Sequence, residues 1–206
     1  MLTVVKMPLN RAEISALCDA AGLILLDIAG VTDVIPADAA WMASACGSDD
    51  GRFDEEFEFQ DPDLVRNANE AWFAIAQRHR LLDQRREFLL SLAVLESDRF
   101  PVSRWALVKL KDEWDIIGAG TANGLLGGPY GRPGFVMVSK TGYTVVAGTT
   151  WQDGISIISL PNPHRASAIR KFMTRTPEGS VTDEEYENIQ NWLSRPPNDT
   201  GRAFEK

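Results

Sequence analysis

The side chains that most often perform covalent or acid–base chemistry are scarce in this sequence. Its 206 residues include two histidines, His79 and His164, and two cysteines, Cys18 and Cys46. A catalytic triad would need one of these histidines, and a nucleophilic cysteine would need a neighbouring base and a lowered pKa. We expect His79 near the end of a helix and His164 at a surface or capping position. Both cysteines lie in alanine-rich segments, which predict buried, inert thiols.

Short motifs of known chemistry are absent as well. The sequence contains no G-x-S-x-G, H-E-x-x-H, C-x-x-C or Walker A motif. Asp49, Asp50 and Gly51 do not continue in the order of an EF-hand calcium loop, which also needs a glutamate at its twelfth position. We therefore predict no catalytic residue, no metal and no cofactor. The sequence favours a protein that is not an enzyme, with chemistry by carboxylates alone left open.

Residues 48–63 (SDDGRFDEEFEFQDPD) are the compositional outlier. They hold eight acids against one base, Arg52, and three phenylalanines are interleaved among the acids. One interpretation is a solvated loop between helices, and another is an acidic, aromatic surface that docks a basic partner. The docking interpretation assigns these partner-binding residues, the last two from the glycine-rich segment that follows: Asp54, Glu55, Glu56, Phe57, Glu58, Phe59, Tyr130 and Arg132.

Residues 118–134 form a glycine-rich segment with seven glycines and two prolines. Glycine allows close approach of the backbone to a ligand, and successive backbone N–H groups can bind anions. The spacing fits neither phosphate-binding fingerprint, so a connection between strands and a protein-contact loop are the other interpretations. The small-ligand alternative, with an anionic ligand between this loop and a basic helix, assigns Gly118, Gly120, Gly124, Arg165, Arg170 and Lys171.

Charge and composition limit the class of partner. The net charge is −8 and the sequence pI is near 4.8, which argues against nucleic acid, whose binding needs clustered Lys and Arg. The charge also disfavours a membrane surface, and no run of 18 apolar residues is present. We expect a cytoplasmic protein whose partner is another protein, and a basic surface on that partner is electrostatically permitted. A homo-oligomer that forms through an exposed sheet edge is a third class.

Periodicity predicts the elements that must position these residues. Residues 135–160 consist of three β-branched and aromatic runs separated by turn signals, which predicts an antiparallel meander. Residues 102–110 predict a central strand and 114–117 a strand beside it. Residues 23–28 fit a strand or a buried turn, and residues 2–5 could form a short strand. The expected fold is α+β: an antiparallel meander of about four to five strands packed against N-terminal and C-terminal helices.

The helices are predicted from apolar stripes and from capping residues. Asn10 with Glu13, and Thr182 with Glu185, have the spacing of a capping box. The expected helices cover residues 11–21, 36–46, 62–82, 163–174 and 183–193. We expect one α+β domain over residues 1–194 and a flexible tail over residues 195–206.

The sequence therefore favours a protein that binds another protein through an acidic, aromatic surface. Such a protein would be an adaptor, an escort of the secretion-chaperone kind, or an inhibitor or immunity-type antagonist. The lack of catalytic motifs and the local concentration of acids beside aromatic rings favour this interpretation.

Overall fold

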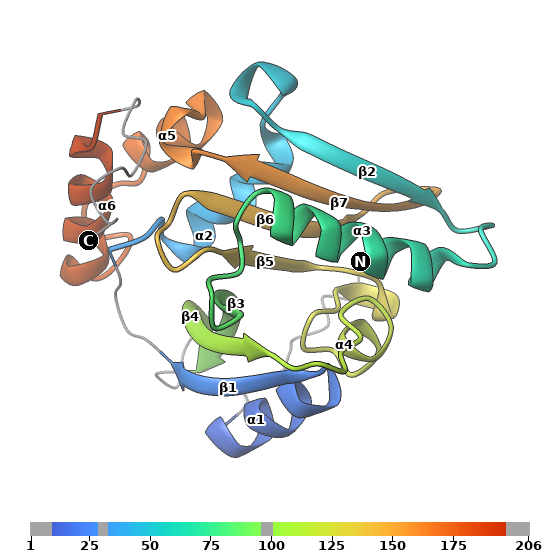
Figure 1. Ribbon diagram of the computed structural model, residues 1–206. Helices are drawn as coiled ribbons and strands as arrows, with labels where there is room; N and C mark the ends of the chain where they lie inside the picture. Colours follow the sequence, from blue (N-terminus) through green and yellow to red (C-terminus); the bar gives the residue numbers. More distant parts are fainter. Residues whose placement is uncertain (1–9, 29–32, 96–100, 197–206) are drawn as a thin grey trace.

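The computed structural model describes residues 10–28, 33–95 and 101–196. Figure 1 shows a sheet seen obliquely, with helices in front of it and behind it. The predicted strand over residues 2–5 lies outside the described residues, as does all but the first two residues of the predicted tail.

One antiparallel sheet of seven strands organises the described chain. Its order is β1-β4-β3-β5-β6-β7-β2, so the strands at its two edges are β1 and β2. The bounds are β1 Leu23–Ile28, β2 Phe53–Glu58, β3 Glu87–Leu95, β4 Pro101–Leu110, β5 Phe135–Val138, β6 Thr144–Thr150 and β7 Gly154–Pro161.

Short and long helices connect the strands and cover both faces of the sheet. The α-helices are α1 Arg11–Ala20, α2 Ala37–Ala40, α3 Leu64–Arg78, α4 Ala119–Ala122, α5 Ser167–Thr174 and α6 Asp183–Ser194. The 3₁₀ turns are η1 Trp41–Ala45, η2 Ser48–Asp50, η3 Pro129–Gly131 and η4 Pro163–Arg165. In Figure 1, α1, α3 and α4 lie in front of the sheet, whereas α2 lies behind it.

The strands send alternate side chains into two separate cores, because successive residues of a strand point to opposite faces. Along β5, Phe135 and Met137 enter the first core, together with residues of α1 and α3. Val136 and Val138 enter the second core, together with residues of α2, η1, α5 and α6. The sheet is therefore the shared middle layer of an α/β/α arrangement.

The ladder between β3 and β5, in the middle of the sheet, is a short one. β3 pairs with β4 over nine residue pairs, from Glu87 opposite Lys109 to Leu95 opposite Pro101. β3 meets β5 through two pairs alone, Leu89 with Val138 and Leu90 with Met137. Three strands on one side of this junction and four on the other are thus joined by a short ladder.

Several predictions are confirmed. The class is α+β with an antiparallel sheet, and β5, β6 and β7 form the expected meander. β1 is a strand rather than a buried turn, and β4 has a neighbour on both sides. Both capping boxes are present, at Asn10 with Glu13 and at Thr182 with Glu185.

The number of strands and two local assignments differ from the prediction. The sheet has seven strands instead of four to five. Residues 114–117 form no strand, because after Lys111 the chain turns back to α1: Asp115 N–H donates to the carbonyl of Ala21. Residues 53–58 form strand β2 instead of part of a loop. Among the described residues, no helix is long and apolar enough to cross a membrane.

Candidate functional site

Residues 53–58, the middle of the acidic segment 48–63, form the edge strand β2, which pairs antiparallel with β7. No described strand lies on its other side, as the top of the sheet in Figure 1 shows. Exposure alternates strictly along β2: the odd-numbered residues are half-buried and the even-numbered ones exposed. Phe53, Phe57 and Phe59 are partly buried against the first core, and they hold the strand in register.

The backbone of β2 also alternates. Phe59 N–H donates to the carbonyl of Asp153 at 2.9 Å, so these two directly opposite residues are a hydrogen-bonded pair. Hydrogen-bonded pairs recur every second residue, so the main-chain groups of Asp54, Glu56 and Glu58 point away from β7. The side chains of these three residues are exposed as well. We call Asp54, Glu56 and Glu58 the acidic edge.

The chain compensates part of the charge of residues 48–63 internally. Arg52 lies 2.9 Å from the carboxylate of Asp54 and donates to the carbonyl of Ser44. Asp50 accepts the backbone N–H of Ser167, at 3.0 Å. Asp61 accepts from Asn67, and Asp63 pairs with Arg66. Within the described part of the chain, Glu56 and Glu58 form no ion pair. The uncompensated charge of the acidic edge is therefore at its C-terminal half.

The predicted loop residues lie beside this half of β2. The guanidinium of Arg132 is 3.9 Å from the centre of the Phe59 ring, a cation–π contact. Tyr130 is 94% exposed and has a φ of 67°, which is uncommon for a residue with a bulky side chain. Gly128 N–H donates to the carbonyl of Arg132 at 2.7 Å, which closes the loop below Tyr130. The structure thus brings together predicted residues more than 70 positions apart.

A further aromatic residue at this end of the sheet was not predicted. Trp151, in the turn between β6 and β7, is 37% exposed. A side chain at Gly154 would lie 2.8 Å from the Trp151 ring and 2.1 Å from the carbonyl oxygen of Phe57. Glycine at 154 therefore lets the indole lie next to β2, where Glu58 is opposite Gly154. The signal in the sequence is a large apolar residue inside a turn, where no core is available to it.

The structure does not bring together the residues of the small-ligand alternative. The backbone N–H groups of Gly118 and Ala119 donate to the carboxylate of Asp115, each at 2.8 Å, so an internal anion already occupies them. Gly120 is buried, and a side chain there would lie 2.7 Å from Leu126, a residue of the first core. Gly124 has a φ of 81°, and a side chain there would meet no atom within 4 Å.

The three basic residues of that alternative belong to the opposite face of the sheet, next to the second core. Arg170 donates to the carbonyl of Leu193 at 2.8 Å and lies 5.9 Å from the centre of the Trp192 ring, so it joins α5 to α6. Arg165 and Lys171 are exposed. The glycines in and next to α4 and these cations are thus on opposite sides of the central layer.

Both histidines contact side chains of the folded interior. His79 Nδ1 is 2.5 Å from the hydroxyl of Ser159, and its ring meets the edge of Phe53 at 5.8 Å. Burial, together with the charge of Arg78, lowers the pKa of His79, so the ring is neutral at pH 7. Ser159 is fully buried, which keeps any substrate from its hydroxyl. His164 is 1% exposed and stacks on Trp192 at 4.3 Å.

The cysteines lie in different cores. Cys18 belongs to the first core and Cys46 to the second, so the sheet separates them, and both are free thiols. Burial raises the pKa of each thiol to about 11. A neutral thiol is a poor nucleophile. Among the described residues, no three His, Cys, Asp or Glu side chains are grouped so that they could hold a metal ion.

No family model, curated protein or solved structure matches the chain.

Proposed function

We propose that this protein binds another protein, as an adaptor, escort or antagonist, and that the acidic edge receives an extended, basic segment of that partner. The observation that supports this proposal is a sheet edge whose outward main-chain groups and exposed carboxylates belong to the same residues. An added strand would bind the N–H and C=O groups of Glu56 and the N–H of Glu58, as in β-strand addition; the carbonyl of Glu58 already accepts the N–H of Asp61 at 3.1 Å. Its Lys or Arg side chains would meet the two uncompensated carboxylates.

The aromatic residues beside this half of the edge would supply the apolar part of the interface. Tyr130 and Trp151 are exposed, and aromatic residues are the commonest anchors of protein interfaces. Arg132 is already held against the Phe59 ring, so its side chain borders the proposed interface at the end of β2. Charged side chains on an edge strand also prevent edge-to-edge aggregation. If preventing aggregation were the only role of these charges, the edge would bind no basic segment. Binding of a basic peptide therefore distinguishes the two roles.

The test uses a fluorescein-labelled peptide, Lys-Val-Arg-Val-Lys, in fluorescence anisotropy. We expect it to bind the wild-type protein, and Glu56→Lys with Glu58→Lys to weaken binding by about tenfold or more, since opposite charges become like charges. The matched control is Glu70→Lys with Glu187→Lys, two exposed acids on α3 and α6 that change the net charge equally. Equal binding by the edge variant and the control variant would contradict the proposal.

A proline variant separates main-chain pairing from charge. The N–H of Glu56 points away from β7, so Glu56→Pro removes an outward donor and leaves the ladder with β7 intact. We expect Glu56→Pro to bind the peptide more weakly than Glu56→Gln, which loses the same charge and keeps the N–H. If the two variants bind equally, the partner does not add a strand to this edge.

A further inference from the structure

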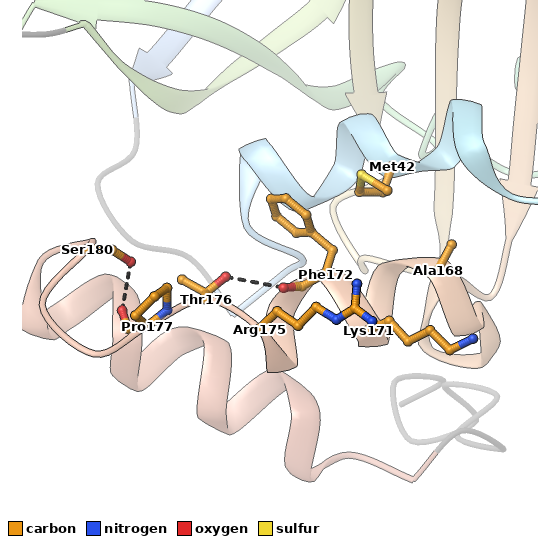
Figure 2. A pocket seen from close by; sticks show the side chains of 8 residues that line it. All are labelled: Met42, Ala168, Lys171, Phe172, Arg175, Thr176, Pro177 and Ser180. Atoms are coloured by element: carbon orange, nitrogen blue, oxygen red, sulfur yellow. Dashed lines mark hydrogen bonds between the residues drawn. The ribbon is translucent and has the colours of Figure 1, made fainter.

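A shallow groove lies beside the second core, between η1 and α5. Its volume is about 560 Å³. Figure 2 shows its lining residues: Met42, Ala168, Lys171, Phe172, Arg175, Thr176, Pro177 and Ser180. None of the eight is buried; each is half-buried or exposed. The groove is therefore open along its length and covers one side of whatever occupies it.

The middle of the groove is apolar. Phe172 is 40% exposed, and its ring points toward the segment that carries Met42 (Figure 2). Ala168, one turn earlier on α5, leaves room beside the ring. The far wall is held by hydroxyl groups of the segment after α5: Ser180 donates to the carbonyl of Pro177 at 2.7 Å. An exposed phenylalanine in a groove of this kind is an anchor site for an apolar side chain.

Two cations lie beside the apolar middle. Lys171 and Arg175 are exposed, lie one turn apart on the same side of the helix end, and form no ion pair with a described residue. Arg170, by contrast, is held by the carbonyl of Leu193. The helix dipole favours cations at the C-terminal end of α5. That effect accounts for the positive charge, but it does not account for the exposed Phe172 beside the two cations.

We propose that this groove binds an acidic segment of a partner protein, in which a large apolar side chain is flanked by carboxylates. The apolar side chain lies on Phe172 and Met42, and the carboxylates meet Lys171 and Arg175. Small-molecule sites cover most of their ligand, whereas this groove covers one side. A peptide fits such a groove because the rest of the partner covers its other side. The proposal goes beyond the proposed function, since it assigns a second surface of opposite charge.

The experiment uses a fluorescein-labelled hexapeptide, Glu-Glu-Leu-Phe-Glu-Glu, in fluorescence anisotropy at about 0.1 M salt, where the Debye length of roughly 10 Å screens repulsion by distant acids. We expect binding by the wild-type protein and at least about tenfold weaker binding by Lys171→Glu with Arg175→Glu. Phe172→Ser is expected to weaken binding while leaving both cations in place. All three side chains are exposed, so the variants keep the fold, which circular dichroism verifies.

The matched control is Arg85→Glu with Arg165→Glu, which changes the net charge equally at two exposed cations outside the groove. Its affinity for the hexapeptide is expected to stay within about twofold of wild type. Equal affinities of the groove variant and the control overturn the proposal, as does equally tight binding of Lys-Lys-Leu-Phe-Lys-Lys.

Two further results would assign the groove to another occupant and also overturn the proposal. One is full displacement of the hexapeptide by micromolar dodecanoate, which would indicate a small amphipathic anion. The other is a dimer in sedimentation that Lys171→Glu with Arg175→Glu dissociates, which would indicate a second copy of this chain.

Discussion

Single residues link strand β4 to helix α6. Arg104 of β4 lies 2.7 Å from the carboxylate of Glu185 in the first turn of α6. The same carboxylate accepts the backbone N–H of Thr182, so it serves both the capping box and the ion pair. Burial alone would raise the pKa of Glu185, but the hydrogen bonds from Thr182 and Arg104 outweigh it and hold the pKa below 4.5. The negative form is therefore the one that stabilises the fold.

This linkage predicts a specific dependence of stability on pH. Because the folded-state pKa is lowered, the contribution of Glu185 is present above pH 4.5 and is lost as the pH falls through the folded-state pKa. We expect Glu185→Gln to reduce the free energy of unfolding by about 1–2 kcal/mol at pH 7. At pH 3 the difference from wild type should shrink. Urea unfolding at both pH values measures it, and an undiminished difference at pH 3 would show that the charge of Glu185 plays no part.

At the scale of elements, the junction between α1 and β1 depends on one glycine. Gly22 has a φ of 78°, and a side chain there would lie 2.3 Å from the Cα of Trp114 and 2.5 Å from the carbonyl oxygen of Glu113. The carbonyl of Gly22 also accepts the N–H of Lys111. The turn after α1 and the segment after β4 are therefore in direct backbone contact.

Two glycine substitutions separate crowding from backbone conformation. Gly51 has a similar φ, 84°, but no atom lies within 4 Å of the position of a side chain there. We expect Gly51→Ala to cost about 1 kcal/mol, which reflects the left-handed backbone alone. Gly22→Ala should cost a further 1–3 kcal/mol or so, because it also forces neighbouring backbone apart. Thermal unfolding of both variants makes the comparison, and equal losses would refute the close contact with Trp114.

The elements that could be predicted are those with strong local signals. The meander was found because turn residues separate β-branched runs, and α1 and α6 because each has a capping box. β2 was missed as a strand because its polar positions are carboxylates, which are rare in strands. Its alternation of Phe and acid in fact matches its alternation of half-buried and exposed residues. The pairing of β2 with β7, about 100 residues later, is a tertiary contact that no local pattern reveals.

The candidate site was predictable only in part. The residue types of the β2 acids and of Tyr130 and Arg132 indicate a binding surface, and the contact of Arg132 with Phe59 brings the loop next to the end of β2. The outward direction of the Glu56 and Glu58 main chain depends on ladder register, which the sequence does not encode locally. The groove at Phe172 was missed for a related reason. The helical stripe predicts Phe172 as buried, but the structure leaves it 40% exposed.

At the scale of the whole molecule, one sheet carries two cores. Trp72 of α3 is fully buried in the first core, and Trp192 of α6 is fully buried in the second. Every inner strand supplies residues to both, as β5 does with Phe135 and Val136. Loss of one core would therefore expose the strands that support the other.

This shared layer predicts a single cooperative transition. We expect Trp72→Ala and Trp192→Ala each to lower the free energy of unfolding by about 3–5 kcal/mol, as for other truncations of large buried side chains. In both variants, far-UV circular dichroism and fluorescence should follow the same urea curve. A Trp192→Ala protein in which α6 melts before the sheet would show instead that the second core is an independent unit.

The two-pair ladder between β3 and β5 has a mechanical consequence. A force that draws β1 and β2 apart acts across every ladder of the sheet at once, and we expect the shortest ladder, between β3 and β5, to yield first. The first rupture is therefore expected at the centre of the sheet, and the extension trace of a chain pulled through these two strands should begin with that event. If a partner protein pulled on β2, the force would be transmitted through β7 and β6 to the ladder between β3 and β5.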